Sequence, residues 1–163
     1  MQNKRCKNGF SLIEILIAIL LVGLAVASLL AANSALTRAN GAGTNLSSAE
    51  FLLGEIRELT ALLSVIDPET GVATFGPEGG ETLATYDDLD DFDTAVFSPP
   101  INADRAALND SAAFSQQITV ENVSASDFEQ VVGDHTSDFV RVTVRVFLNG
   151  QEISSASWLR ARY

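Results

Sequence analysis

Two acidic features of this 163-residue chain have a composition and spacing that could do chemistry. The first is a cluster in the segment Tyr86–Asp93, made up of Asp87, Asp88, Asp90, Asp91 and Asp93. Carboxylates this close together repel one another, and carboxylate oxygens are the ligands that Ca²⁺ prefers. The segment lacks the glycine and the distal glutamate of an EF-hand loop. We therefore interpret it as a solvated acidic loop, with a Ca²⁺ site as the alternative.

Other candidates for catalysis or metal binding are few. His135 is the only histidine and Cys6 the only cysteine. A zinc site needs several nitrogen or sulfur ligands, and no nucleophile is marked beside His135. The sequence therefore predicts no catalytic residue, no cofactor and no enzyme.

The second acidic feature is Glu14, the one charged residue in the apolar run of residues 10–32. A helix of this length rises about 35 Å, enough to cross the hydrocarbon core of a bilayer. Lys4, Arg5 and Lys7 precede the run, so the positive-inside rule places the N-terminus in the cytoplasm and the rest of the chain outside it. An acid inside a membrane span is costly, which makes Glu14 a candidate functional residue.

Two interpretations of this run compete. In an ordinary secretory signal, Ala25-Val26-Ala27 would be a cleavage site and the mature protein would start near Ser28. In the other interpretation the apolar helix is kept and the chain is cut between Gly9 and Phe10. Glu14 favours the second, because a cut there creates an α-amino group that could pair with Glu14 of a neighbouring subunit.

The stretch Lys7-Asn8-Gly9-Phe10-Ser11-Leu12-Ile13-Glu14, followed by Ile15-Leu16-Ile17-Ala18, resembles the class III signal of type IV pilins and pseudopilins. In that family a prepilin peptidase cleaves after the glycine and methylates the new N-terminal residue. The resemblance assigns Gly9 and Phe10 to processing, with N-methylation of Phe10, and Glu14 to assembly. It also implies helix flexibility at Gly23, for which close helix packing is the alternative.

The Asp-Asp-Leu-Asp-Asp-Phe stretch at residues 87–92 is similar to one in some minor pilins of the mannose-sensitive haemagglutinin pilus type. The two resemblances together imply a minor type IV pilin that is assembled into a pilus or primes it. A minor pseudopilin of a type II secretion system is the first alternative, and a tip adhesin that binds through the loop 67–112 is the second. The implied partners are other pilin or pseudopilin subunits, prepilin peptidase, an inner-membrane assembly platform and the lipid bilayer.

The net charge of the chain also bears on its partners and its location. Removal of residues 1–9 leaves seven arginines against 21 acidic residues, a net charge of −14. Such a surface repels phosphate backbones, so we expect no nucleic-acid partner. We expect a single-pass inner-membrane protein with a cytoplasmic N-terminus and a periplasmic C-terminal domain, which later enters the pilus or pseudopilus filament.

The elements that position these residues can be predicted from periodicity. We expect a leader (1–9), a transmembrane helix (10–32), an amphipathic continuation of that helix (33–66) and a loop-plus-sheet domain (67–163). Apolar residues at helical spacing predict the face of the continuation that is packed in the core. They are Leu46, Ala49, Leu53, Ile56 and Leu63.

The C-terminal part contains strand patterns at residues 116–123, 139–148 and 151–160. The second alternates strictly between valine and polar residues. Asn149-Gly150 between the last two predicts a two-residue hairpin turn with positive φ. The regular register of such a hairpin would place Val140 opposite Leu159 and Trp158 opposite Arg141. The fold class is therefore α+β, a long N-terminal helix packed on an antiparallel sheet of three or four strands.

Overall fold

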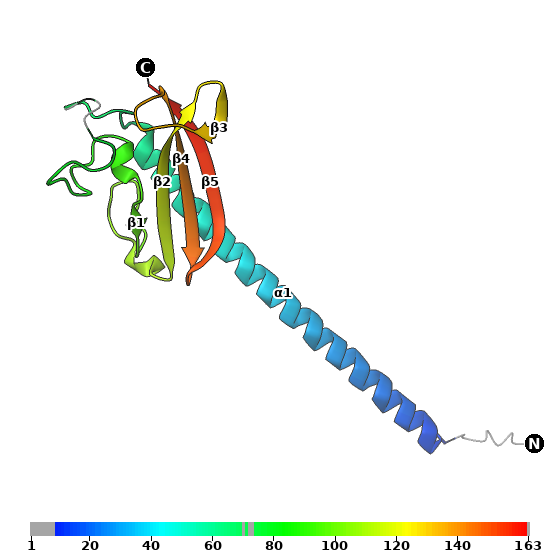
Figure 1. Cartoon of the computed structure of the whole chain (residues 1–163). Coiled ribbons are helices and arrows are strands. Elements are labelled where there is room, and N and C mark those ends of the chain that lie inside the picture. The colour runs from blue at the N-terminus through cyan, green and yellow to red at the C-terminus, as the bar shows by residue number, and fades with distance from the viewer. Residues whose placement is uncertain (1–8, 70, 72–73, 163) are drawn as a thin grey trace, which may run out of the picture. The chain divides into compact units, whose positions relative to one another are not determined.

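The computed structural model describes residues 9–69, 71 and 74–162. The long helix α1 (Leu12–Ala61) comes first, followed by loops and a sheet (Figure 1). The chain divides between Gly43 and Thr44 into two compact units, so that α1 contributes to both. In the first unit α1 continues without a break through Gly23 and Gly41. The expected flexibility at Gly23 remains a prediction.

The second unit contains a five-stranded antiparallel sheet. Its strands are β1 (Val96–Phe97), β2 (Phe114–Ser124), β3 (Asp127–Val131), β4 (Phe139–Leu148) and β5 (Gln151–Ala161). They are ordered β1-β2-β4-β5, and β3 pairs with the end of β2. The α+β fold is confirmed. The sheet exceeds the expected three or four strands because β1 and β3 form in segments where we predicted none.

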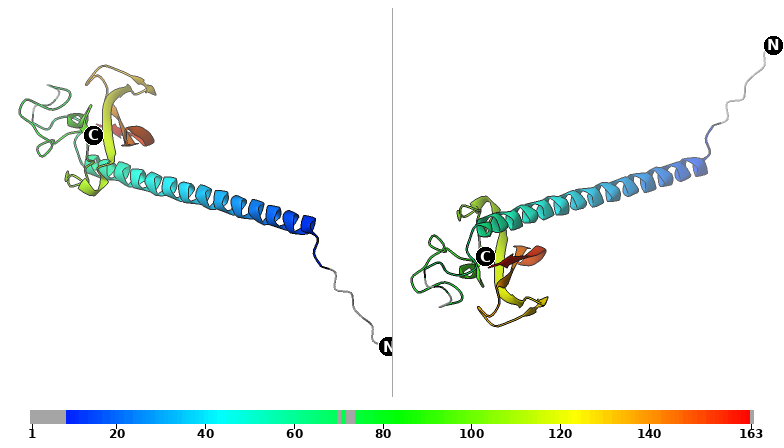
Figure 2. Two further views of the ribbon diagram at one scale, coloured as in Figure 1. Left: turned by 90° about the horizontal axis from the view of Figure 1, so that it is seen from below. Right: turned by 90° about the horizontal axis from the view of Figure 1, so that it is seen from above.

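The part of α1 that belongs to this unit packs against the sheet, which lies on one side of it in Figure 2. Ala49, Leu53 and Ile56 are buried in the shared core, as their spacing predicted. Leu46 is 49% exposed, so its predicted place in the core is wrong. The helix buries Leu52 and Thr60 as well, and the Thr60 hydroxyl donates to the carbonyl of Ile56 at 2.8 Å. A threonine can enter the core in this way because the helix supplies its acceptor.

The strand β4 confirms its predicted alternation. Its inward side chains are fully or almost fully buried: Val140, Val142, Val144 and Val146. The turn to β5 is also as predicted, with φ of 50° at Asn149 and 80° at Gly150. These values place both turn residues in the left-handed region that a type I′ turn requires.

The register of this hairpin shifts after two pairs. Phe147 pairs with Glu152, but Val146 pairs with Ser154, so Ile153 is the extra residue of a β-bulge. Beyond the bulge Val142 lies opposite Trp158 and Val140 lies opposite Arg160. The predicted pairings of Trp158 with Arg141 and of Val140 with Leu159 are therefore both wrong. The bulge reverses which alternate residues of β5 face the core.

Because of this shift, Trp158 packs against the hydrophobic core. Its ring lies 5.9 Å from the guanidinium carbon of Arg57 on α1, a cation–π distance. Arg141 instead faces the other side of the sheet, where it pairs with Glu121 at 2.9 Å.

Candidate functional site

The N-terminal end of α1 is built around Ser11. The backbone N–H of Glu14 lies 3.3 Å from the Ser11 hydroxyl oxygen and 3.1 Å from its carbonyl oxygen. Ser11 is therefore the N-cap of the helix, and Glu14 is the third helical residue. A serine followed three residues later by a glutamate is the pattern of a capping box. We did not predict this role for Ser11, although that pattern, directly before the apolar run, was its signal.

Gly9 and Phe10 lie just before the helix and are exposed, Phe10 by 79% of its surface. The peptide bond between them is outside regular structure, the setting in which proteases cut most readily. The predicted leader residues Lys4, Arg5 and Lys7 fall outside the described residues.

The apolar half of α1 is long and apolar enough to cross a membrane, and none of its most apolar stretch is buried within the protein. Its leucine, isoleucine and valine side chains are largely exposed. A continuous apolar surface of this extent needs lipid or other protein to cover it. A signal sequence near an N-terminus has the same length and composition, so the helix alone does not distinguish the two.

A family match at this segment favours the helix that is kept. Residues 4–30 match the prokaryotic N-terminal methylation motif. The match supports the type IV pilin or pseudopilin class, with prepilin peptidase processing and association with other pilin subunits, and it points to a structural subunit more than to an enzyme. The apolar helix fits membrane anchoring of such a protein. No curated protein and no solved structure matches the chain significantly.

The aspartate cluster is located differently from our expectation. Asp88, Asp90 and Asp91 are only 1–2% exposed, so the interpretation as a solvated loop is wrong for these three residues. The cause lies in the residues next to them: Leu89 and Phe92 are fully buried in the core. Packing of these two side chains carries the neighbouring aspartates inside, Asp90 and Asp91 within the short 3₁₀ helix η1 (Asp90–Phe92) and Asp88 just before it.

Backbone N–H groups satisfy part of the buried carboxylates. Asp91 Oδ2 accepts from the N–H groups of Asp87 at 2.9 Å and Asp88 at 3.3 Å. Asp88 Oδ1 accepts from the N–H of Asp91 at 3.1 Å, and Asp90 Oδ2 from that of Gly76 at 3.2 Å. Asp90 Oδ1 and Asp91 Oδ1 have no hydrogen-bond partner among the described residues.

Burial changes the protonation of the cluster. It raises the pKa of Asp88 to about 7, and the adjacent carboxyl group of Asp90 is the second cause. Burial likewise raises the pKa of Asp91 to about 6, helped by the charge of Asp88, and raises the pKa of Asp90. Desolvation disfavours the ionised form of each acid.

Two glutamates that we did not single out from the sequence lie beside the cluster. A carboxylate oxygen of Glu78, one of Glu81 and one of Asp91 lie within 4.8 Å of one another. We could not predict this arrangement because Asp91 is ten residues or more from the glutamates in the sequence. Their approach depends on the fold of the loop between α1 and β1.

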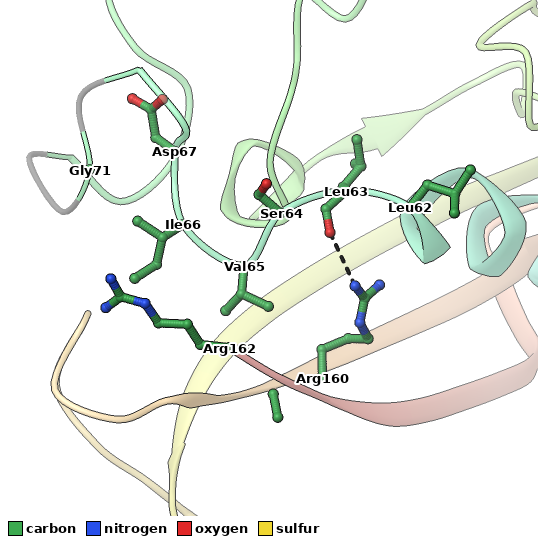
Figure 3. Close-up of a pocket in the computed structure, with 10 residues that line it drawn as sticks. Leu62, Leu63, Ser64, Val65, Ile66, Asp67, Gly71, Arg160 and Arg162 are labelled. Carbon is green, nitrogen blue, oxygen red and sulfur yellow. Dashed lines mark hydrogen bonds between the residues drawn. The ribbon is translucent and has the colours of Figure 1, made fainter.

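The cavity in Figure 3 lies at the other end of this loop, between residues 62–67 and the end of β5. Arg160 on its wall donates to the carbonyl oxygens of Thr60 at 2.7 Å, Ala61 at 2.9 Å and Leu63 at 3.1 Å (the last drawn in Figure 3). The last carbonyls of a helix have no partner within it. Arg160 therefore ties the C-terminal end of α1 to the sheet, a structural role.

His135 also has structural contacts. Its backbone N–H donates to Asn122 Oδ1 at 2.7 Å, and its Nε2 lies 3.0 Å from the carbonyl oxygen of Thr74. The ring packs edge-on against Phe75 at 5.4 Å. These contacts fix the loop before β4 on strand β2 and on the loop between α1 and β1.

Proposed function

We propose that this protein is a minor type IV pilin, cut between Gly9 and Phe10, methylated at Phe10 and assembled into a pilus or used to prime one. The observation that carries the proposal is Glu14, a single carboxylate in the exposed apolar helix and four residues after the new N-terminus. It lies within the segment that matches the methylation motif.

The mechanism follows from charge pairing in a medium of low dielectric constant. The apolar half of α1 holds the subunit in the bilayer and then packs with other subunits in the filament. An isolated Glu14 carboxylate is costly in both places. The methylated amino group of a neighbouring subunit offsets that cost, and only one axial position of the two helices brings the charges together. The pair therefore sets register more than it adds stability.

The structure suggests a second role for Glu14 that the test must separate from this one. As the third residue of a helix with a serine cap, its side chain could also serve the capping box. Glutamine serves a capping box as well as glutamate does, but it has no charge. Glu14→Gln thus removes only the charge, while Glu14→Ala removes both functions.

We would express each variant in the native host and measure its incorporation into sheared filaments, with the processed form in membranes as the control for cleavage. If the charge pair directs assembly, both variants lose incorporation roughly tenfold or more, the effect of about 1.5–3 kcal/mol for a charged hydrogen bond. Normal incorporation of Glu14→Gln would refute the charge pair and leave a capping role.

The alternative of a minor pseudopilin has the same N-terminal chemistry. Genes for a secretin and secreted hydrolases beside this one would favour it, whereas pilus retraction genes would favour the pilin. The loop proposed for a tip adhesin contributes Leu89, Phe92 and Ile101 to the buried core. This contribution favours a structural role for much of that loop.

A further inference from the structure

The loop between α1 and β1 brings three carboxylates together from two separate turns. Glu78 and Glu81 come from the first turn and Asp91 from η1, and their nearest oxygens lie within 4.8 Å of one another. The first turn is closed by two hydrogen bonds. The N–H of Glu78 donates to Glu81 Oε2 at 3.0 Å, and the N–H of Glu81 donates to the carbonyl oxygen of Glu78 at 3.1 Å. The first of these bonds fixes the Glu81 carboxylate on the Glu78 backbone, and both glutamates have an oxygen close to one of Asp91.

Asp91 gives this group a feature that a surface cluster lacks. Its carboxylate is 1% exposed, and its Oδ2 is fixed by two backbone N–H groups. Its Oδ1 has no hydrogen-bond partner among the described residues. A buried carboxylate oxygen without a partner costs several kcal/mol unless a positive charge or a donor is supplied.

No side chain of the described protein supplies that charge. The ion pairs of the described residues all lie on the sheet, between Arg141 and Glu121, Arg141 and Glu129, and Arg145 and Glu152. Arg105 reaches the same loop, but its guanidinium donates to the carbonyl oxygens of Leu83 and Tyr86. The positive charge that offsets Glu78, Glu81 and Asp91 therefore comes from solution, as a proton at low pH or as a cation where the three groups are ionised.

We propose that Glu78, Glu81 and Asp91 bind a calcium ion. Oxygen atoms that share one Ca²⁺ at 2.3–2.6 Å can be at most about 5 Å apart, which accommodates the observed separations. The ligand set is all carboxylate, which suits Ca²⁺ better than Zn²⁺, whose protein sites are built mainly from cysteine and histidine. Mg²⁺ keeps most of its water and an octahedral shell, whereas Ca²⁺ accepts irregular sets completed by water or backbone carbonyls.

The bound ion would cross-link the turn at residues 78–81 to η1. Because Phe92 of η1 is buried in the core against the sheet, this cross-link acts on the stability of the whole second unit. Extracellular calcium modules bind with dissociation constants of about 10⁻⁴–10⁻³ M, a range suited to a filament subunit outside the cytoplasm. The site does not depend on the pilin proposal, since it uses none of the N-terminal residues.

The test uses the full chain in detergent micelles at about pH 7.5, stripped with EGTA and then titrated with CaCl₂ or MgCl₂. Thermal unfolding is followed through Trp158, the only tryptophan, which packs on the core. At a hundredfold excess of Ca²⁺ over its dissociation constant, we expect the Tm to rise by roughly 5–10 °C. Isothermal titration with CaCl₂ should give one site per chain, and MgCl₂ at the same concentration a much smaller shift.

Glu78→Gln is the decisive variant, and Glu58→Gln, an exposed residue on α1, is its matched control. Glu78→Gln should lose most of the calcium response yet be at least as stable as the wild type in EGTA, because it removes one of the mutually repelling charges. Glu58→Gln should keep the full response. Glu81→Gln provides a second variant if Glu78→Gln does not fold.

Two results would overturn the proposal. One is a wild-type Tm that does not change with Ca²⁺, and the other is an equal calcium response in Glu78→Gln and Glu58→Gln. Neither result bears on Glu14 or on filament assembly, so the site and the proposed function fail independently.

Discussion

Gln116 offers the sharpest test of how the second unit is held together. This β2 side chain is fully buried, and its amide donates to the carbonyl oxygens of Leu52 on α1 at 2.9 Å and Ile101 at 3.2 Å. Its Oε1 accepts from the N–H of Ile101 at 2.8 Å. One side chain thus joins the helix, the loop before β2 and the sheet.

Replacing it as Gln116→Leu keeps a side chain of similar size and removes all three hydrogen bonds. The Ile101 N–H is then buried without a partner, which costs about 1–3 kcal/mol. The two carbonyl oxygens lose a donor at about 1 kcal/mol each, and burial of the leucine offsets part of the total. We expect a net loss of about 2–4 kcal/mol in the free energy of unfolding.

The assay is urea unfolding in detergent micelles, followed through Trp158 fluorescence. Gln117→Leu is the matched control, because Gln117 is the next residue of β2 and points to the other face, where it is only half-buried. We expect that control to change the free energy of unfolding by no more than about 0.5 kcal/mol. Equal stability of Gln116→Leu and Gln117→Leu would refute the reasoning.

Three further predictions concern the same unit. In EGTA, stability should fall as the pH rises from about 4 to about 7. The raised pKa values of Asp88 (about 7) and Asp91 (about 6) mean that the folded state binds more protons than the unfolded one in this range. Urea unfolding at several pH values measures this change, and Asp88→Asn should make it smaller. A wild-type stability that does not depend on pH would contradict the prediction. Arg160→Met should lower the free energy of unfolding by about 2–4 kcal/mol, because three carbonyl contacts are lost. Its control, Arg162→Met at an exposed residue, should lower it by about 0.5 kcal/mol or less. Equal losses in urea unfolding would contradict this prediction. Gly150→Ala should cost about 1–2 kcal/mol in the same assay, because alanine is strained at a φ of 80°; an unchanged stability would count against the type I′ turn.

The sequence was sufficient for features set by neighbouring residues. The alternation of β4, the Asn149-Gly150 turn and the start of the hairpin register depend on local geometry, and all were predicted correctly. The bulge at Ile153 was not predicted, because it depends on packing of β5 against α1. A slip of one residue changes which side chains face the core, so this single bulge moved Trp158 inward.

Features that depend on distant contacts could not be predicted from the sequence. An aspartate cluster ordinarily stays in water, and its burial here follows from the packing of Leu89 and Phe92. The approach of Glu78 to Asp91 depends on the same loop fold. Gln116 carries no local signal that it bonds to a helix carbonyl. At the N-terminus, by contrast, the motif is contiguous, so Gly9, Phe10 and Glu14 were assigned from their order, and their roles stay predictions.

The central claim is that the apolar helix stays in the mature protein with a new, modified N-terminus. N-terminal sequencing and intact mass of the protein purified from membranes of its native host test it directly. We expect a chain that starts at N-methylated Phe10. A chain that starts near Ser28, or one that keeps residues 1–9, would contradict the account.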